Sequence, residues 1–147
     1  MANFLTSFLA NVLGIGARTP IASVNWREDP TEATVGIHLL SHYGSEQEYL
    51  SNETSIESIR EELDRLDWEG NFYQFVVVIE PGISMEVGGS LNGVDGLSAM
   101  YRNRLDQVEG VIKEPPEDVL EMKHILELFV SGTDKWMQEY EFGFISY

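Results

Sequence analysis

Residues 114–136 read EPPEDVLEMKHILELFVSGTDKW and predict one well-marked helix, placed at 114–130. Pro115 and Pro116 are tolerated at a helix start, where the first N–H groups lack an intrahelical partner. Gly132 follows the pattern, and glycine accepts the left-handed conformation of many helix exits. Apolar residues recur at spacings of three and four, which indicates one buried helix face: Val119, Met122, Leu126 and Phe129.

The rest of the chain predicts strands and two more helices. Residues 1–13 fit a short amphipathic helix, and a capping-box pattern at 54–57 (TSIE) begins another helix that Gly70 ends. Residues 72–79 are aromatic and β-branched almost throughout, which fits a central strand covered on both faces. Residues 41–52 are polar and are expected to form a loop. Further strands are predicted at 21–27, 33–40, 83–87, 97–102, 108–112 and 139–146.

This order of elements predicts an α+β fold in which a mostly antiparallel sheet packs against about three helices. A chain of 147 residues, 43% of them hydrophobic, is long enough for a real core. Chains of this size bury roughly 70% of their unfolded-state surface. Because no repeat, low-complexity tract or linker interrupts the sequence, residues 1–147 are expected to form a single domain.

The charge balance is strongly acidic. Twenty-five Asp and Glu stand against nine Lys and Arg, which gives a net charge of −16 at pH 7. Such a field repels nucleic acid and anionic membranes, so neither is expected as a partner. It suits a cationic partner, and it also suits simple solubility.

The sequence predicts a cytoplasmic protein. There is no cysteine, which excludes disulfides, thiolate metal sites and cysteine nucleophiles. The apolar N-terminus lacks the basic start of a signal peptide, since the first positive side chain is Arg18, and it is too short to span a bilayer.

No catalytic residue, metal site or cofactor is predicted. His38 and His42 are four residues apart, which places two ligands on one face of a helix but not on a strand that enters a turn. His124 falls on the outer side of its helix and is expected at the surface. Residues 14–16 (GIG) lack the third glycine of a phosphate loop, and 92–96 lack the calcium-loop spacing. Carboxylates are plentiful, but no pair is singled out for general acid–base chemistry.

The C-terminal half resembles a known family. Over roughly residues 73–147 the order of features is Gly88-Gly89, a strand at 97–101, Glu114-Pro115-Pro116, a helix with Phe129 near its end, an SGTD exit and Trp136. This order is similar to the immunity proteins of bacterial polymorphic toxin systems, and closest in pattern to the family usually called immunity protein one. The resemblance implies a small non-enzymatic protein that binds a cognate toxin domain, often a nuclease or nucleobase deaminase, and blocks its active site.

The predicted contact surface is acidic. Residues 46–69 hold nine acids against two arginines, a net charge of −7. Glu57, Glu61 and Asp64 share the helix face opposite the apolar one, and Trp68 extends that face if the helix continues for another turn. An exposed Trp ringed by acids would supply buried area while the charges steer a basic cleft toward it. Alternatively, the acids are only solvated and Trp68 tucks into the core. The predicted partner-binding residues are Glu46, Glu48, Glu57, Glu61, Asp64, Trp68 and Glu69.

Two other functional classes stay open. One is an acidic regulatory adaptor or nucleic-acid mimic without a toxin partner. The other is a hydrolase that uses carboxylates in a surface cleft. Mixing the purified protein with the product of the adjacent gene would separate these classes, and the sequence makes no prediction of the oligomeric state.

Overall fold

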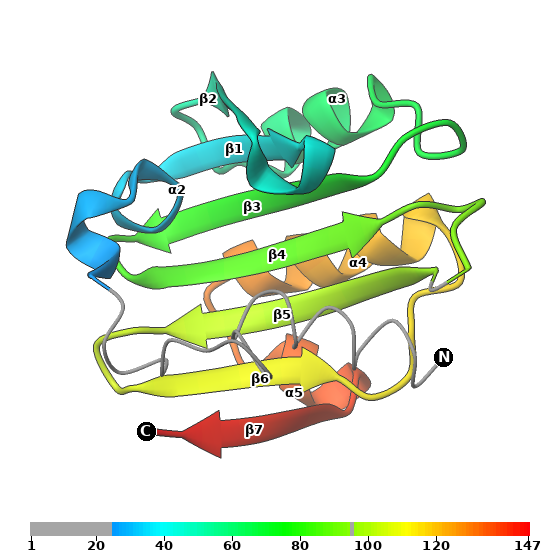
Figure 1. The fold of residues 1–147 in the computed structure, drawn as a ribbon. Coiled ribbons are helices and arrows are strands. Elements are labelled where there is room, and N and C mark those ends of the chain that lie inside the picture. The colour runs from blue at the N-terminus through cyan, green and yellow to red at the C-terminus, as the bar shows by residue number, and fades with distance from the viewer. Residues whose placement is uncertain (1–24, 95) are drawn as a thin grey trace.

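The computed structural model describes residues 25–94 and 96–147, and its sheet is built from seven strands. These are β1 (Gly36–Ser41), β2 (Glu46–Ser51), β3 (Tyr73–Glu80), β4 (Ile83–Gly89), β5 (Leu97–Asn103), β6 (Val108–Ile112) and β7 (Phe142–Ser146). They form one antiparallel sheet in the order β2-β1-β3-β4-β5-β6-β7 (Figure 1). The predicted helix at 1–13 and most of the strand at 21–27 lie outside the described residues.

The helical segments are η2 (Trp26–Glu28), α2 (Pro30–Ala33), η3 (His42–Gly44), α3 (Ile56–Asp64), α4 (Val119–Val130) and α5 (Lys135–Glu139). Helices α3, α4 and α5 lie behind the sheet in Figure 1, so the α+β prediction is confirmed. Alternate strand residues such as Phe75 and Val77 pack there with Ile59 of α3 and with Leu126 and Phe129 of α4. The core assignment of Leu126 and Phe129 is therefore confirmed, since both are buried.

Side-chain caps fix where the two longer helices begin. The hydroxyl of Ser55 accepts a hydrogen bond from the Ser58 N–H (3.1 Å), as the capping-box pattern predicts. For α4 the predicted start was wrong, because Asp118 is the cap and accepts from the Glu121 N–H at 2.8 Å. The prolines at 115 and 116 precede the helix, since a residue before proline is disfavoured in the helical conformation.

Three other predicted segments differ from the structure. The loop at 41–52 contains β2, which is polar because it lies at the edge of the sheet and is largely exposed to solvent. Residues 26–28 form a helical turn where a strand was expected. The last strand begins at Phe142, because α5 occupies 135–139.

The face opposite the helices combines apolar and charged buried residues. Val76, Val78 and Met100 are buried there, which confirms that β3 is covered on both faces. Buried Glu86 and Arg102 lie on the same face. In the described part of the chain, no helix has the length and apolar character needed to cross a membrane.

Candidate functional site

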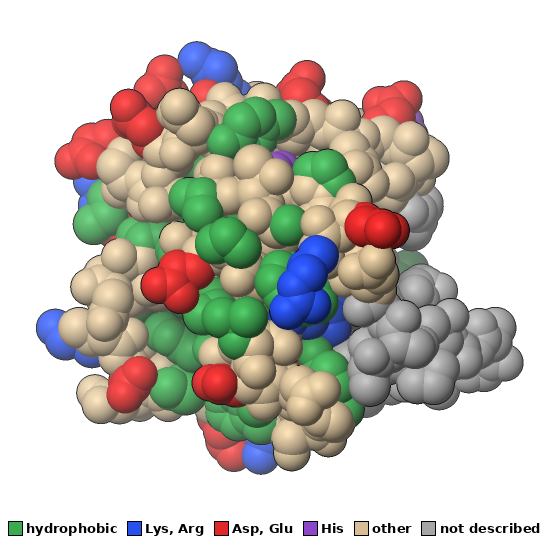
Figure 2. All heavy atoms as spheres, turned by 90° about the vertical axis from the view of Figure 1, so that its left-hand side faces the viewer, with side chains coloured by type: hydrophobic (Ala, Val, Ile, Leu, Met, Phe, Trp, Pro, Cys, Tyr) green, Lys and Arg blue, Asp and Glu red, His purple; other side chains and the backbone are tan. Residues whose placement is uncertain are grey.

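The exposed acids of β2, α3 and the turn after α3 gather along one edge of the molecule. Strand β2 is the first in the sheet order, and the chain leads from it directly into α3. Figure 2 shows Asp and Glu side chains along the upper edge, which β2 and α3 form in Figure 1. We name this surface the acidic rim; its members, all exposed, are Glu46, Glu48, Glu57, Glu61, Asp64 and Glu69.

The strand register orients the β2 part of the rim. Glu48 pairs with Leu39, a core residue on the helix-covered face, and Glu46 pairs with Ser41 two residues further along the same strand. Both carboxylates therefore point to the side of the sheet on which α3 lies. The structure thus brings six of the seven predicted contact residues to one edge of the molecule.

The basic residues near the rim neutralise only part of it, and Arg65 pairs there with Glu61 at 3.1 Å. Arg60 donates to Glu127 of α4 at 2.8 and 3.1 Å, and that hydrogen bond raises the pKa of Arg60. Lys123, also on α4, contacts Asp64 at 2.8 Å. Within the described residues Glu48 and Glu57 have no ion pair, so part of the rim is free to meet a cationic group.

The seventh residue, Trp68, was wrongly placed on this surface. Its side chain is 3% exposed, its indole N–H donates to the Leu63 carbonyl (3.3 Å), and its ring meets Tyr73 edge-on. Helix α3 ends at Asp64, so the extra turn that would have turned Trp68 outward does not form. The Trp68 carbonyl also accepts the Leu91 N–H at 2.9 Å, which ties the β4–β5 loop to this position. Trp68 belongs to the core, as the alternative interpretation held.

Tyr49 of β2 is an exposed aromatic residue at this edge, and sequence reasoning missed it. It is 50% exposed, stacks on His38, and its hydroxyl donates to the Val35 carbonyl (2.7 Å). Its ring lies over Gly36, where a Cβ would come within 2.6 Å of a ring carbon. These contacts fix an aromatic ring on the same edge strand. Because Tyr49 pairs with His38, its ring points to the face of the sheet opposite the one to which Glu46 and Glu48 point. The available signal was a tyrosine next to alternating glutamates in residues 46–51, which is typical of an edge strand.

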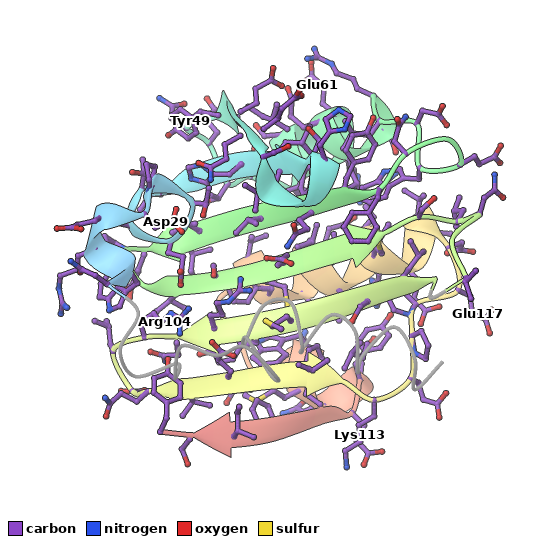
Figure 3. All side chains as sticks on the ribbon, in the orientation of Figure 1. Asp29, Tyr49, Glu61, Arg104, Lys113 and Glu117 are labelled. Carbon is purple, nitrogen blue, oxygen red and sulfur yellow. The ribbon has the colours of Figure 1, made fainter. Side chains whose placement is uncertain are left out.

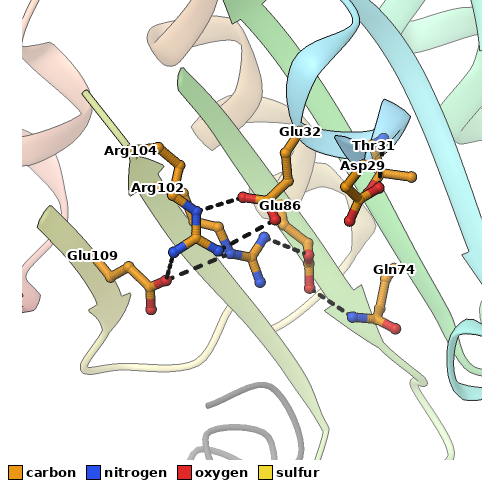
Figure 4. A network of polar contacts seen from close by, with 8 residues as sticks. All are labelled: Asp29, Thr31, Glu32, Gln74, Glu86, Arg102, Arg104 and Glu109. Atoms are coloured by element: carbon orange, nitrogen blue, oxygen red, sulfur yellow. Dashed lines mark hydrogen bonds and ion pairs between the residues drawn. The ribbon is translucent and has the colours of Figure 1, made fainter. Parts of the chain in front are cut away.

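A second charged region is buried at another part of the sheet (Figure 4). We name it the ionic cluster: Glu32 of α2, Glu86 of β4, Glu109 of β6, Arg102 of β5 and Arg104 in the turn after β5. Arg104 donates to Glu32 at 2.6 Å and to Glu109 at 2.9 Å, and Arg102 donates to Glu86 at 2.9 Å. The cluster therefore ties α2 to β4, β5 and β6, three consecutive strands that lie about 50 or more residues further along the chain.

Burial and charge act against each other in the ionic cluster. Burial raises the pKa of Glu109, and the two guanidinium groups lower it only in part. For Arg102, burial opposes the charged form, but Glu86, Glu32 and Glu109 together raise its pKa above the ordinary value. Within residues 25–94 and 96–147, one carboxylate oxygen of Glu109 and the Nε of Arg102 have no hydrogen-bond partner. The three carboxylates and two guanidinium groups of the ionic cluster pair with one another across α2 and the strands. We therefore assign the cluster a structural role, which is to hold α2 to the strands.

The three histidines occupy separate places. His38 is buried with its Nε2 2.8 Å from the Thr34 carbonyl, whereas His42 is exposed and 3.7 Å from Glu46. His124 is at the surface beside Glu139 (2.8 Å), where the sequence placed it. Among residues 25–94 and 96–147, no group of three or more His, Cys, Asp or Glu side chains is arranged to hold a metal ion.

Comparison with protein-family models, with curated proteins and with solved structures found no match to this chain. The functional conclusion therefore depends on the chain's own surface chemistry. On β2 the exposed carboxylates of Glu46 and Glu48 and the exposed, fixed ring of Tyr49 occupy opposite faces of one edge strand.

Proposed function

We propose that the chain is an immunity-type protein, a cytoplasmic inhibitor without catalytic activity that binds a toxin domain with a basic cleft. The supporting observation is the acidic rim: residues 46–69 carry a net charge of −7, and the six acids of the rim are exposed along one edge. A toxin that acts on nucleic acid or nucleotides needs a cationic cleft to bind phosphate groups. The rim presents carboxylates to that cleft and occludes its active site.

Charge and aromatic contact contribute differently to this binding. The net charge of −16 and the local excess on the rim attract a cationic domain and raise the association rate. A partner that reaches around the β2 edge also meets Tyr49 on the other face, where the ring supplies rigid contact area because it is already held against Gly36 and His38 before any partner arrives. We therefore expect loss of rim charge to slow association and loss of the Tyr49 ring to speed dissociation.

The direct test is to mix the purified chain with the product of the adjacent gene. The proposal predicts a stable complex on size-exclusion chromatography and loss of that protein's nuclease, deaminase or other toxic activity. A basic protein of similar size and charge serves as the control. Equal affinity for both would favour an acidic adaptor, and turnover that disappears with one carboxylate-to-amide change in the purified chain would favour a hydrolase.

A further inference from the structure

The edge of the sheet opposite the acidic rim carries no charge. Strand β7 is the last in the sheet order, and residues 142–147 (FGFISY) include no acidic or basic side chain. Phe144 and Ile145 point to opposite faces of the sheet and are each 47% exposed. The register between β6 and β7 is regular over all five pairs, so no bulge disturbs this edge. Exposed edges are usually protected by charge, proline or a bulge, and β7 has none of these.

The backbone of β7 presents donors and acceptors outward. The Lys113 N–H donates to the Glu141 carbonyl at 2.9 Å, and the Tyr147 N–H donates to the Gln107 carbonyl at 3.0 Å. Residues 141 and 147 therefore face β6, and the alternation of an antiparallel ladder turns every second residue between them away from β6. The outward residues are Phe142, Phe144 and Ser146. Among the described residues no strand pairs with them.

We propose that this edge pairs with the same edge of a second copy of the chain, antiparallel and about a two-fold axis at Phe144. In that register Phe144 lies opposite Phe144 of the second copy, and Phe142 lies opposite Ser146. The outward backbone N–H and carbonyl groups of the two copies then form hydrogen bonds with one another. The edge is thus self-complementary, as a two-fold interface must be.

Charge favours a second copy as the occupant of this edge. Two chains of −16 repel each other, and an uncharged strand edge is where they approach with least cost. Strands β2 and β7 are at opposite ends of the sheet order, so the acidic rims lie at the two far ends of the joined sheet. A cationic partner would find no counter-charge on residues 142–147. Both rims stay accessible in the dimer, and the inference does not depend on the proposed function.

Sedimentation velocity of the full chain over a concentration series tests the pairing. We expect a monomer–dimer equilibrium that strengthens as salt screens the repulsion. Ser146→Pro removes an outward N–H and keeps the ladder to β6, so it should weaken dimerisation by roughly tenfold or more. The control is Leu120→Lys, which removes an apolar side chain that is 70% exposed on α4 and should leave the dimer unchanged.

A second variant covers the case in which the proline unfolds the strand. Ile145→Lys puts a charge on the edge without altering the backbone, and it should weaken the dimer while the circular dichroism spectrum is retained. A chain that stays monomeric at every concentration and salt overturns the proposal. A dimer that survives both edge variants, or that Leu120→Lys weakens equally, also overturns it.

Discussion

The acidic rim and the ionic cluster use the same side chains in opposite ways. In the rim, carboxylates of one sign lie in solvent, and the ion pairs that form there, such as Arg65 with Glu61, are exposed. In the ionic cluster, Glu86, Arg102 and Glu109 are at most 6% exposed and lie in each other's fields. Exposed pairs contribute about 0–1 kcal/mol to stability, whereas an unpaired buried charge costs several kcal/mol. We therefore expect changes in the ionic cluster to affect stability, and changes in the rim to affect the proposed binding.

The largest effect on stability is expected at Trp68, which is next to Glu69 of the rim in the sequence and is buried in the core. Trp68→Ala should lower the free energy of unfolding by roughly 3–5 kcal/mol, because a buried ring and its hydrogen bond to Leu63 are lost. Chemical denaturation would measure this. A loss below 1 kcal/mol would mean that Trp68 is exposed and belongs to the rim after all.

A slightly smaller loss should follow from breaking the ionic cluster. Arg102→Met keeps much of the volume but leaves Glu86 with Gln74 as its remaining hydrogen-bond partner and removes one counter-charge from Glu109. We expect about 3 kcal/mol of destabilisation, the lower end for removing one partner of a buried pair. Urea denaturation at pH 7 would measure this loss of stability. An unchanged midpoint would mean that the ionic cluster, like the rim, contributes little to stability.

The pH dependence of stability should reveal Glu109. Burial raises its pKa above the ordinary 4.5, so between that raised pKa and 4.5 the native state binds more protons than the unfolded chain. The free energy of unfolding contributed by this group therefore increases as the pH falls through that window. Glu109→Gln removes this contribution. As the pH is lowered from 7, the parent should therefore gain free energy of unfolding relative to the Glu109→Gln variant. Parallel pH profiles for the two proteins would contradict the assignment.

The apolar periodicity of the sequence was enough to predict six of the seven strands, the start of α3 and the buried face of α4. It failed at Trp68, because periodicity does not fix where α3 ends. Extending the helix by one turn past Asp64 would place Trp68 on the outer face, whereas the helix ends before Trp68 and its side chain is in the core. It also failed at β2, since an exposed edge strand needs no apolar alternation. The ionic cluster was beyond sequence reasoning, because Glu32 and Arg104 are 72 residues apart and only the pairing of strands brings them together.

The smallest change in stability is expected in the rim itself. Glu57 and Glu61 are exposed, and the contact of Glu61 with Arg65 is solvated. The double variant Glu57→Lys with Glu61→Lys should shift the free energy of unfolding by no more than about 0.5 kcal/mol. Thermal melts would check this, and a loss similar to that of Arg102→Met would show that the rim is structural.

The central claim is that the acidic rim captures a cationic toxin domain, and the association rate constant across a salt series tests it most directly. The parent chain should associate quickly at low salt and slow steeply as salt is added. Glu57→Lys with Glu61→Lys should associate at least about tenfold more slowly and with a flatter salt dependence. The matched control, Glu114→Lys with Glu117→Lys, makes the same charge change at exposed positions near the start of α4, away from the rim (Figure 3). It should associate much faster than the rim variant. Equal rates for the rim variant and the parent, or a larger loss in the control, would contradict the account and place the contact elsewhere.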